Sequence, residues 1–483
     1  MIDDELNKAT DDLRCAVDSI DIPPFEAPVG PEMAATRPAA ESVTTLADAP
    51  SEQRKSANRI FSVAASVVLI AAGAAAAIKL TEDDGTSGSV RGIDVTNEIT
   101  SPEHQWPDGD TWQNGVDGPE ALTEIELVAP KFGRHVVDPT FGTTIEAVEN
   151  TSASTSFMPL QVRPAFNADG SNILMYRGGD GFSLVDATTL TEVQALAIDP
   201  VDIEEVYWHP SDPKLLYFVD GSANGGFELK LIDVETGDAV TVHTYAGCSM
   251  VRGVDSHRIS AETLLLGQKC TAGEGEFMVS VNVETGDVLT QPADGLGSPQ
   301  PTPSSGRYVA SDSDGNVTVL DSQLQSTGVT FDAGSDDYVL VETSNGQDLL
   351  VTMSFAADES EAGLIVTFDL DDGFRTIIGG QVDGYPYPPS GGGMTTSVAN
   401  DGRVLFATGW DETSGAMTGE IMTVDFDDET PAIRRLAHHR STRRNVDDVA
   451  WSGPHASLRP QLAVVVFASD WDGATSSPYI LSG

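Results

Sequence analysis

The chain has 483 residues, and its 75 Asp and Glu residues against 26 Lys and Arg residues give a formal net charge of −49 at pH 7. This charge excludes a protein that binds a nucleic-acid backbone, because such proteins need a basic surface. Full disorder is excluded as well, since 40% of the residues are hydrophobic and can form a sizeable core.

Residues 1–59 are predicted to form a cytoplasmic tail with a short amphipathic helix. Hydrophobic residues follow near-helical spacing from Leu6 to Ile20, with acidic residues first, where they suit the helix dipole. Residues 21–53 are rich in Pro, Ala, Glu, Ser and Thr and are predicted to be disordered. The helix either docks on a cytoplasmic partner, as in membrane-anchored anti-sigma regulators, or has no partner. The zinc motif of many such regulators is absent, because Cys15 stands alone in this segment.

Residues 60–78 read IFSVAASVVLIAAGAAAAI and contain no charge. A helix of this length nearly crosses a hydrocarbon core of about 30 Å, which predicts one transmembrane helix over 60–79. Three basic residues lie just before it at 54–59, and three acidic residues follow at 82–84. The positive-inside rule therefore predicts a single-pass protein of the cell membrane whose C-terminal domain is extracytoplasmic. The alternatives are a buried helix of a soluble protein and an uncleaved signal segment.

Residues 80–120 are rich in Gly, Pro and Asp and are predicted to form an extracytoplasmic linker. The stretch WPDGDTWQNGVDG (106–118) brings oxygen-bearing side chains together as a calcium loop does, but it does not match the EF-hand pattern. We interpret it as a solvated turn. The turns SDSDGN (311–316) and FDLDDG (368–373) offer calcium similar ligands, although Asp-Gly is preferred in hairpin turns without a metal. No other cofactor is expected.

Residues 121–483 are predicted to form an all-β domain, because short β-branched and aromatic runs alternate with Gly, Asp, Asn and Ser turns. An apolar strand that ends in Asp or Asn before a turn recurs as VDATTL, IDVETG, VNVETG, LDSQLQ, FDLDDG and VDFDDE. These anchors are separated by 39 to 56 residues, a spacing typical of propeller blades with four antiparallel strands. Six complete units run from about 162 to 440.

The seventh unit is one strand short. It offers an inner strand near Val446–Trp451, then AVVVFASDW (463–471) and PYIL (478–481). Because an unpaired edge strand is a liability, we predict that TTIEAVE (143–149) supplies the missing strand and closes the ring. The predicted fold is therefore an all-β, seven-bladed β-propeller closed by an N-terminal strand. One transmembrane α-helix and a mostly disordered cytoplasmic tail precede it.

The stretch PAFNADGSNILMY (164–176) resembles the inner hairpin of bacterial TolB-type, WD40-like (PD40) propeller repeats. Residues 206–218 and 397–408 are weaker matches, and 454–471 is similar to the last such hairpin without its Asp-Gly turn. Residues 137–148 resemble the lead-in segment of some bacterial proteins of this kind. The resemblance implies a propeller fold and no particular function, because propellers host unrelated activities.

Two cysteines lie in the predicted third unit. Cys248 precedes its inner strand and Cys270 ends its second strand. Since the start of one antiparallel strand faces the end of the next, the two thiols can meet. Disulfides persist outside the cytoplasm, so we predict a bond between them, with two reduced buried thiols as the alternative.

The segment IRRLAHHRSTRR (433–444) is basic in an otherwise acidic domain. Arginine binds carboxylate or phosphate through paired hydrogen bonds, which suits an anionic ligand such as a uronate polymer. The alternative is that acids of 425–429 and 447–448 neutralise the patch within the protein. The candidate ligand-binding residues are Arg434, Arg435, His438, His439, Arg440, Arg443, Arg444, Trp451 and His455.

The sequence contains no HExxH, GxSxG, P-loop or CxxC motif. We therefore expect the extracytoplasmic propeller to bind a protein or a cell-envelope ligand, such as a glycan, without catalysis. An extracytoplasmic enzyme acting on an anionic saccharide is the alternative. Oligogalacturonate lyases are propellers that use metal-bound histidines, but their set of three His and a Gln cannot be matched to positions here. An anti-sigma-like transmembrane regulator is the third hypothesis.

Overall fold

The computed structural model describes residues 111–118, 122–149, 157–159, 164–178, 181–221, 226–253, 259–273, 275–334, 338–353, 364–379, 395–398, 403–407, 417, 419–426, 433–441, 453–471 and 475–483. The predicted tail (1–59) and span (60–79) lie outside these residues. Within them there is no helix of any kind, and accordingly none long and apolar enough to cross a membrane.

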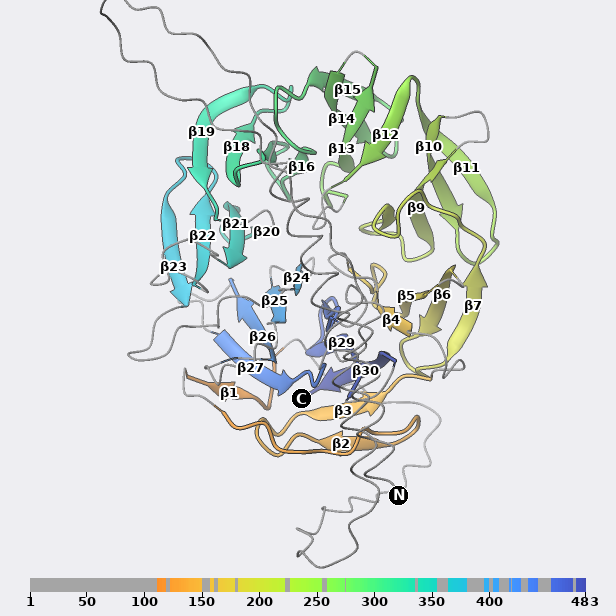
Figure 1. Ribbon diagram of the computed structural model, residues 1–483, viewed down its shortest axis with the longest axis vertical. Coiled ribbons are helices and arrows are strands. Elements are labelled where there is room, and N and C mark those ends of the chain that lie inside the picture. The colour runs from red at the N-terminus through yellow and green to blue at the C-terminus, as the bar shows by residue number, and fades with distance from the viewer. Residues whose placement is uncertain are drawn as a thin grey trace, which may run out of the picture. The chain divides into compact units, whose positions relative to one another are not determined.

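The described strands form seven sheets arranged as blades around a ring (Figure 1). This arrangement confirms the seven-bladed β-propeller predicted from the repeats. In the first five blades the chain runs outward, from the inner strand to the outer strand, with every neighbouring pair antiparallel.

The strands of these blades have the following bounds. Blade 1 contains β4 (Phe157–Pro159), β5 (Asn172–Arg177), β6 (Gly181–Asp186) and β7 (Glu192–Leu196). Blade 2 contains β8 (Val206–Trp208), β9 (Leu215–Gly221), β10 (Phe227–Asp233) and β11 (Ala239–Tyr245). Blade 3 contains β12 (Cys248–Arg252), β13 (Leu265–Ala272), β14 (Gly275–Asn282) and β15 (Val288–Pro292). Blade 4 contains β16 (Gln300–Pro301), β17 (Tyr308–Ser311), β18 (Asn316–Leu320) and β19 (Ser326–Asp332). Blade 5 contains β20 (Tyr338–Glu342), β21 (Asp348–Met353), β22 (Ile365–Asp369) and β23 (Arg375–Gly379).

The hydrophobic core lies in layers between neighbouring blades. Between blades 2 and 3, for example, Tyr217 and Leu229 pack with Leu266 and Val279, and all four side chains are buried. Strand side chains alternate between two faces, so each blade buries one face against each neighbour. The apolar strands are therefore buried on both sides, as the short hydrophobic runs of the sequence indicate.

The recurring Asp or Asn anchors close the turn between the third and fourth strands. The Asp233 carboxylate accepts hydrogen bonds from the backbone N–H groups of Glu235 (2.9 Å) and Thr236 (3.1 Å). Gly237 then takes a φ of +76°, which only glycine adopts freely. Leu190 holds the corresponding position of blade 1 at a φ of +56°. The sequence repeat thus reflects one recurring turn, in which the oxygen of the Asp or Asn side chain accepts the hydrogen bonds of the turn in place of a backbone carbonyl.

The last blade is completed by the N-terminal segment, as predicted. Its strands from the inside outward are β28 (Ser457–Leu458), β29 (Val464–Ser469), β30 (Ser477–Ser482), β3 (Thr144–Ala147) and β2 (His135–Val137). Strand β3 pairs antiparallel with β30, with Ile145 opposite Leu481. The sequence did not indicate β2, the fifth strand. The inner strand predicted near 446–451 lies outside the described residues.

Blade 6 also gains a fifth strand from the N-terminal segment. It contains β24 (Thr395–Val398), β25 (Arg403–Ala407), β26 (Glu420–Asp425), β27 (Ile433–His438) and β1 (Val116–Asp117). Trp112 is buried in the core layer between blades 6 and 7. The expected linker (80–120) therefore overlaps the ring over 111–118. The solvated-turn interpretation is wrong for Trp112, which is buried, and for Val116–Asp117, which pair with the edge of β27, whereas Thr111, Gln113, Asn114 and Gly118 are exposed.

We call residues 111–118 and 122–149 the strap. Its two pieces are joined by a hydrogen bond from the Gly115 N–H to the Phe141 carbonyl oxygen (2.8 Å). The Thr143 hydroxyl donates to the Leu436 carbonyl oxygen of β27 (2.7 Å). The strap thus binds blades 6 and 7 together across the point where the ring closes (Figure 1).

The predicted disulfide is present in blade 3. Cys248 and Cys270 are bonded, with their Cα atoms 5.5 Å apart. Cys248 lies opposite Ala272 rather than Cys270, and a register shift follows between Cys248 and Met250. The bond therefore runs diagonally from β12 to β13, at the inner hairpin of the blade.

Candidate functional site

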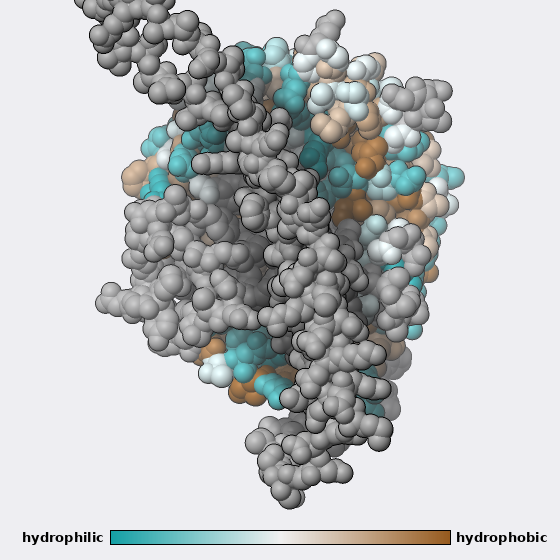
Figure 2. Space-filling model, in the orientation of Figure 1, coloured by the Kyte–Doolittle hydropathy of each residue, from teal (hydrophilic) through white to brown (hydrophobic). Residues whose placement is uncertain are grey.

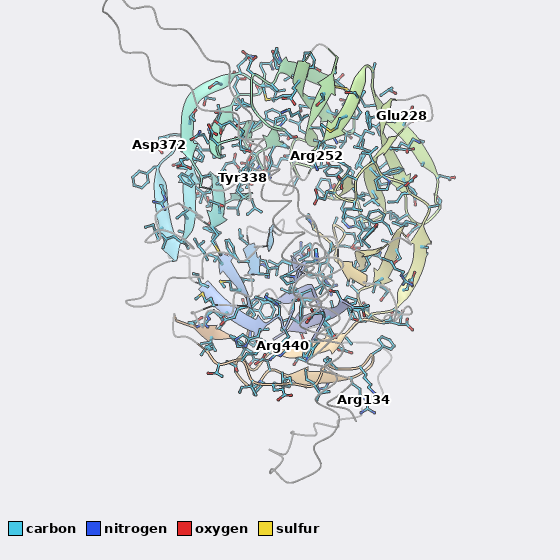
Figure 3. All side chains as sticks on the ribbon, in the orientation of Figure 1. Arg134, Glu228, Arg252, Tyr338, Asp372 and Arg440 are labelled. Carbon is cyan, nitrogen blue, oxygen red and sulfur yellow. A yellow bond between two sulfur atoms is a disulfide. The ribbon has the colours of Figure 1, made fainter. Side chains whose placement is uncertain are left out.

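The described part of the basic segment 433–444 lies on the outer strand β27 and on the residues that follow it. Its side chains meet the strap, which covers the outer edge of blade 6. Figure 3 shows Arg440 among the elements of blades 6 and 7 that the strap joins. Arg443, Arg444 and Trp451 lie outside the described residues. The sequence patch is therefore described at Arg434–Arg440 and at His455.

Arg434 lies on the solvent side of β27. Its Nη1 donates to both carboxylate oxygens of Asp117, each at 2.8 Å, and its Nε donates to the Asn114 carbonyl oxygen at 3.2 Å. The Arg434 side chain is 29% exposed and that of Asp117 is 69% exposed. This is a surface ion pair between β27 and β1, and such pairs contribute at most about 1 kcal/mol.

Arg435, the next residue, points into the protein and is fully buried. Its Nε donates to Glu420 Oε2 (2.7 Å) and its Nη2 to Glu420 Oε1 (2.6 Å), so the pair is bidentate. Its Nη1 donates to the Gly118 carbonyl oxygen of the strap (3.0 Å). Burial raises the pKa of Glu420, although the hydrogen bond and charge of Arg435 act in the opposite direction. The guanidinium thus compensates a buried carboxylate and holds the strap at the same time.

Arg440 makes a second buried ion pair with the strap. Its Nη2 donates to Asp138 Oδ2 (2.9 Å), and its Nη1 donates to the His438 carbonyl oxygen (2.7 Å). Asp138 Oδ1 accepts from the Thr140 N–H (2.9 Å), so this carboxylate also shapes the turn that leads into β3. The guanidinium carbon lies 5.1 Å from the centre of the Trp471 ring, which adds a cation–π contact.

The described histidines of the patch are all buried. His438 Nε2 lies 3.7 Å from Glu420 Oε1, and its ring meets the edge of Phe141 with 5.1 Å between centroids. Burial, followed by the positive charge of Arg440, lowers the pKa of His438 to about 4, so its ring is neutral at pH 7. His439 Nδ1 accepts a hydrogen bond from the Ser441 N–H (3.0 Å). His455 is buried beside Gly453.

The described arginines of the patch bind acids that the sequence analysis did not name. Asp117 and Asp138 are 317 and 302 residues away from their partners in the sequence. A pairing at this distance depends on ring closure, so local charge patterns cannot indicate it. The available signal was the lead-in stretch 137–148, which resembles known propeller segments and contains Asp138.

A second buried polar cluster joins blades 2 and 3, and sequence reasoning missed it. Glu205 accepts hydrogen bonds from the Tyr207 hydroxyl (2.6 Å), Gln268 Nε2 (2.8 Å) and the Gly253 N–H (2.5 Å). The Tyr245 hydroxyl donates to Gln268 Oε1. Burial, and then the nearby Glu205, raise the pKa of Tyr245 well above its usual value. These three bonds of the Glu205 side chain hold the start of blade 2 to itself and to blade 3, which is a structural role.

The aspartate-rich turn 311–316 uses its first carboxylate as an internal acceptor. Asp312 accepts from the Asp314 N–H (2.8 Å) and from the backbone and side chain of Asn316 (both 3.0 Å). Burial alone would raise the pKa of Asp312, but these hydrogen bonds outweigh it and lower the pKa. Among the residues that the structure describes, no three His, Cys, Asp or Glu side chains are placed to hold a metal ion.

No known protein family matches the sequence, and no curated protein matches it either. Solved structures do resemble the fold. An oligogalacturonate lyase in complex with manganese has a TM-score of 0.51 and 15% identity, covering 72% of this chain and 95% of its own. The oligogalacturonate lyase of Vibrio parahaemolyticus has a TM-score of 0.50 and 14% identity, covering 72% and 96%. TolB from Acinetobacter baumannii has a TM-score of 0.33 and 14% identity, covering 59% and 64%.

At these identities the likeness is one of fold alone. The inner hairpin of blade 1 agrees with the resemblance found in the sequence. Phe166 bridges to Ile173, and the Asn167 N–H donates to the Asn172 carbonyl oxygen (3.1 Å) around the Asp-Gly turn. The chain is therefore a seven-bladed β-propeller, a class that is defined by its blades and not by an activity.

Proposed function

We propose that this chain is a single-pass membrane protein whose extracytoplasmic propeller binds a protein or a cell-envelope ligand without catalysis. In this proposal residues 60–79 span the membrane and residues 1–59 remain in the cytoplasm. The uncharged window with its basic N-terminal flank supports the span. The disulfide between Cys248 and Cys270 supports an extracytoplasmic ring, because such bonds persist in oxidising compartments.

The observation that carries the non-catalytic role is the use of the buried charges. Arg435 holds Glu420 and the strap carbonyl, Arg440 holds Asp138, and Glu205 accepts from three donors of blades 2 and 3. A catalytic acid or base needs a free face toward a substrate. Arg435 instead faces Glu420, Arg440 faces Asp138, and Glu205 faces its three donors. These contacts hold the strap and the blades together. The ring then offers a rigid scaffold whose connecting loops do the binding.

Arg443 and Arg444 are our candidate ligand contacts, since the charge of the described arginines is engaged within the protein. The test is a binding screen of the full chain in detergent against anionic envelope polysaccharides and extracytoplasmic proteins. Arg443→Gln/Arg444→Gln should weaken binding of an anionic ligand about ten-fold or more for each lost charged hydrogen bond. The matched control, Lys214→Gln/Arg307→Gln, removes the same charge from other blades and should leave binding unchanged. Equal losses in both variants would contradict the proposed site.

An extracytoplasmic enzyme acting on an anionic saccharide remains the second candidate, and the likeness of fold to oligogalacturonate lyases favours it. The same screen separates the two, because a bound ligand should be recovered intact. Incubation with oligogalacturonate and manganese gives the direct comparison. Appearance of shortened, unsaturated products with the wild-type chain would replace the binding proposal by the enzyme.

A cytoplasmic partner of residues 1–59 is the part of the proposal that concerns signalling. An anti-sigma-like regulator would bind a cytoplasmic protein through the hydrophobic face between Leu6 and Ile20. A pull-down with the full chain should recover that partner, and Leu13→Glu/Val17→Glu should abolish its recovery. Recovery of the same proteins by both forms would remove the signalling role and leave the extracytoplasmic binding role untouched.

A further inference from the structure

One stretch of the strap differs from the rest of this acidic chain. Residues 127–137 read LVAPKFGRHVV and contain no acidic residue, although 75 of the 483 residues are Asp or Glu. They contain two basic residues, Lys131 and Arg134, and one histidine. The stretch therefore carries a local charge of about +2 on a chain whose net charge is −49. We call residues 127–137 the rim loop.

The rim loop presents apolar side chains to solvent. Eleven large hydrophobic side chains are exposed among the described residues, and three of them, Val128 (85%), Phe132 (47%) and Val137 (46%), lie in this loop. A fourth, Ile125 (46%), lies two residues before it. The other seven exposed hydrophobic residues lie in or next to blades 1, 2, 3 and 5. Clustering of this kind on a soluble surface marks an interaction site.

The local geometry directs an aromatic side chain and two bases outward together. The Arg134 N–H donates to the Lys131 carbonyl oxygen (2.9 Å), which closes a tight turn with Phe132 and Gly133 at its centre. Gly133 has a φ of +73°, and a Cβ added there would meet nothing within 4 Å, so the turn projects into open space. This order, Lys-Phe-Gly-Arg, places an aromatic ring between two cations.

The turn lies at the outer rim of the ring. It leads into β2, the outermost strand of blade 7, which pairs only with β3 among the described strands. Figure 3 shows Arg134 at this rim, on the side of β2 away from the ring. The small part of the lower edge that Figure 2 leaves uncovered shows hydrophobic and hydrophilic residues next to each other. Trp471 fixes the base of the loop, since its indole N–H donates to the Leu127 carbonyl oxygen (2.8 Å).

The predicted membrane span, which lies close to the strap in the sequence, indicates which surface this rim contacts. The predicted span ends at Lys79, and only the 31 residues 80–110 separate it from Thr111, where the strap begins. Even fully extended, this tether spans no more than about 115 Å, so the membrane is always present at a high effective concentration. Aromatic side chains next to Lys or Arg are typical of segments that enter the interface of a bilayer. Anionic lipid headgroups attract these two bases and repel the acidic surface of the other blades.

We propose that the rim loop docks on the outer surface of the bilayer that holds the span, with Phe132 and Val128 in the interface and Lys131 and Arg134 on anionic headgroups. This inference rests on the membrane anchoring proposed above. It fixes which edge of the propeller faces the lipid. The ring then stands on its blade 6–7 edge, and the blades opposite that edge are the ones that face away from the membrane.

The test uses the full chain in lipid nanodiscs, in a Cys15→Ser background, with a polarity-sensitive fluorophore on Val128→Cys. Discs of phosphatidylcholine are compared with discs that contain phosphatidylglycerol, and quenching by a nitroxide lipid is compared with quenching by iodide. In phosphatidylglycerol discs the label should be quenched by the lipid and shielded from iodide. A label on Val240→Cys, exposed on blade 2, should show the reverse.

Variants assign the contact to the named residues. Lys131→Gln/Arg134→Gln should lower the equilibrium constant for docking about thirty-fold, or about five-fold for each base near an anionic surface. Phe132→Ser should reduce docking in both kinds of disc. Phe374→Ser removes another exposed aromatic residue, 68% exposed and far from the strap in sequence, and should change nothing.

The outcomes separate the two proposals. A chain that fails to enter the discs overturns the membrane anchoring, and the contact falls with it. A chain that enters the discs while residue 128 stays open to iodide overturns the lipid contact alone. Shielding of residue 128 in detergent that grows with protein concentration identifies a second copy or another protein as the occupant, which also overturns the contact.

Discussion

The Arg435–Glu420 pair offers the sharpest test of how the strap is held. Arg435→Met keeps much of the side-chain volume and removes the guanidinium. It deletes two hydrogen bonds to Glu420 and one to the Gly118 carbonyl oxygen. The side chain of Glu420 is only 1% exposed, so water cannot replace the lost donors. Breaking a buried pair in this way costs about 3–5 kcal/mol in the free energy of unfolding.

Arg434→Met is the matched control, one residue away on the same strand. It removes an ion pair of similar length, in which one nitrogen donates to both oxygens of Asp117, but the Asp117 side chain is 69% exposed and is solvated once its partner has gone. The expected loss is below about 1 kcal/mol. The comparison holds the strand, the substitution and the charge change constant, and its main variable is burial.

The cost of Arg435→Met should depend on pH in a defined direction. Burial already raises the pKa of Glu420 in the folded protein above its usual value of 4.5, and loss of Arg435 raises it further. The folded state then binds a proton that the unfolded state releases, so ionisation of Glu420 costs stability. The deficit should be larger near pH 7 and should shrink as the pH falls toward 4.5.

Equilibrium urea denaturation followed by tryptophan emission measures these differences. The double variant Arg435→Met/Glu420→Met should recover to within about 1–2 kcal/mol of the wild type, because the orphaned carboxylate is gone. Equal losses for Arg434→Met and Arg435→Met would refute the reasoning, and so would a deficit for Arg435→Met that grows on acidification. Either result would mean that the buried pair does not govern this edge of the ring.

Three further expectations follow from single features of the ring. Cys248→Ala/Cys270→Ala removes a disulfide between residues that are 22 apart in the sequence and should lower the free energy of unfolding by roughly 3 kcal/mol. Denaturation curves of the wild type with and without a reducing agent should show the same difference. Gly237 has a φ of +76° and open space around it, so Gly237→Ala should lower the free energy of unfolding, measured by thermal unfolding, by about 1 kcal/mol. Gly273 has equal space and no positive φ, so Gly273→Ala should be neutral or slightly stabilising. His438 is neutral in the folded state with a pKa of about 4, so wild-type stability should fall as the pH drops from 6.5 toward 4, and His438→Gln should flatten that part of the stability–pH curve.

The ring and its closure could be predicted because they rest on local patterns that repeat. The anchor turns recur since each blade needs the same acceptor, as at Asp233 and Asn282, and a repeat makes a weak signal visible. The closing strand was predicted from a count: the last unit lacked a strand, and 143–149 had the right alternation. The pairing of Ile145 with Leu481 confirms this inference.

The candidate site could be predicted only in part, because its partners are brought together by ring closure. The basic segment was visible, and so was the idea that acids of the protein neutralise it. The identity of those acids was not, since Asp117 and Asp138 lie more than 300 residues from the arginines that they bind. The fifth strands β1 and β2 were missed for a similar reason. A strand of two or three residues is too short to show a periodic pattern, and whether it forms depends on the edge strand with which it can pair.

The position of the strap also decides which bonds a pull on the tether would load first. In the membrane anchoring proposed above, a pull from the membrane side acts at Thr111, ahead of Trp112 and β1. It first meets the buried Trp112 side chain and the hydrogen bond from the Gln113 N–H to the Gly483 carbonyl oxygen (3.3 Å), and then the Arg434–Asp117 pair and the bond from Arg435 to the Gly118 carbonyl oxygen. The closing strand β3 begins 26 residues after Gly118, behind the buried Arg440–Asp138 pair. These earlier attachments therefore shield ring closure, so that β1 can leave blade 6 while β3 still pairs with β30. A propeller tethered by its own closing segment needs such an order of release, because otherwise any tension on the anchor would open the ring.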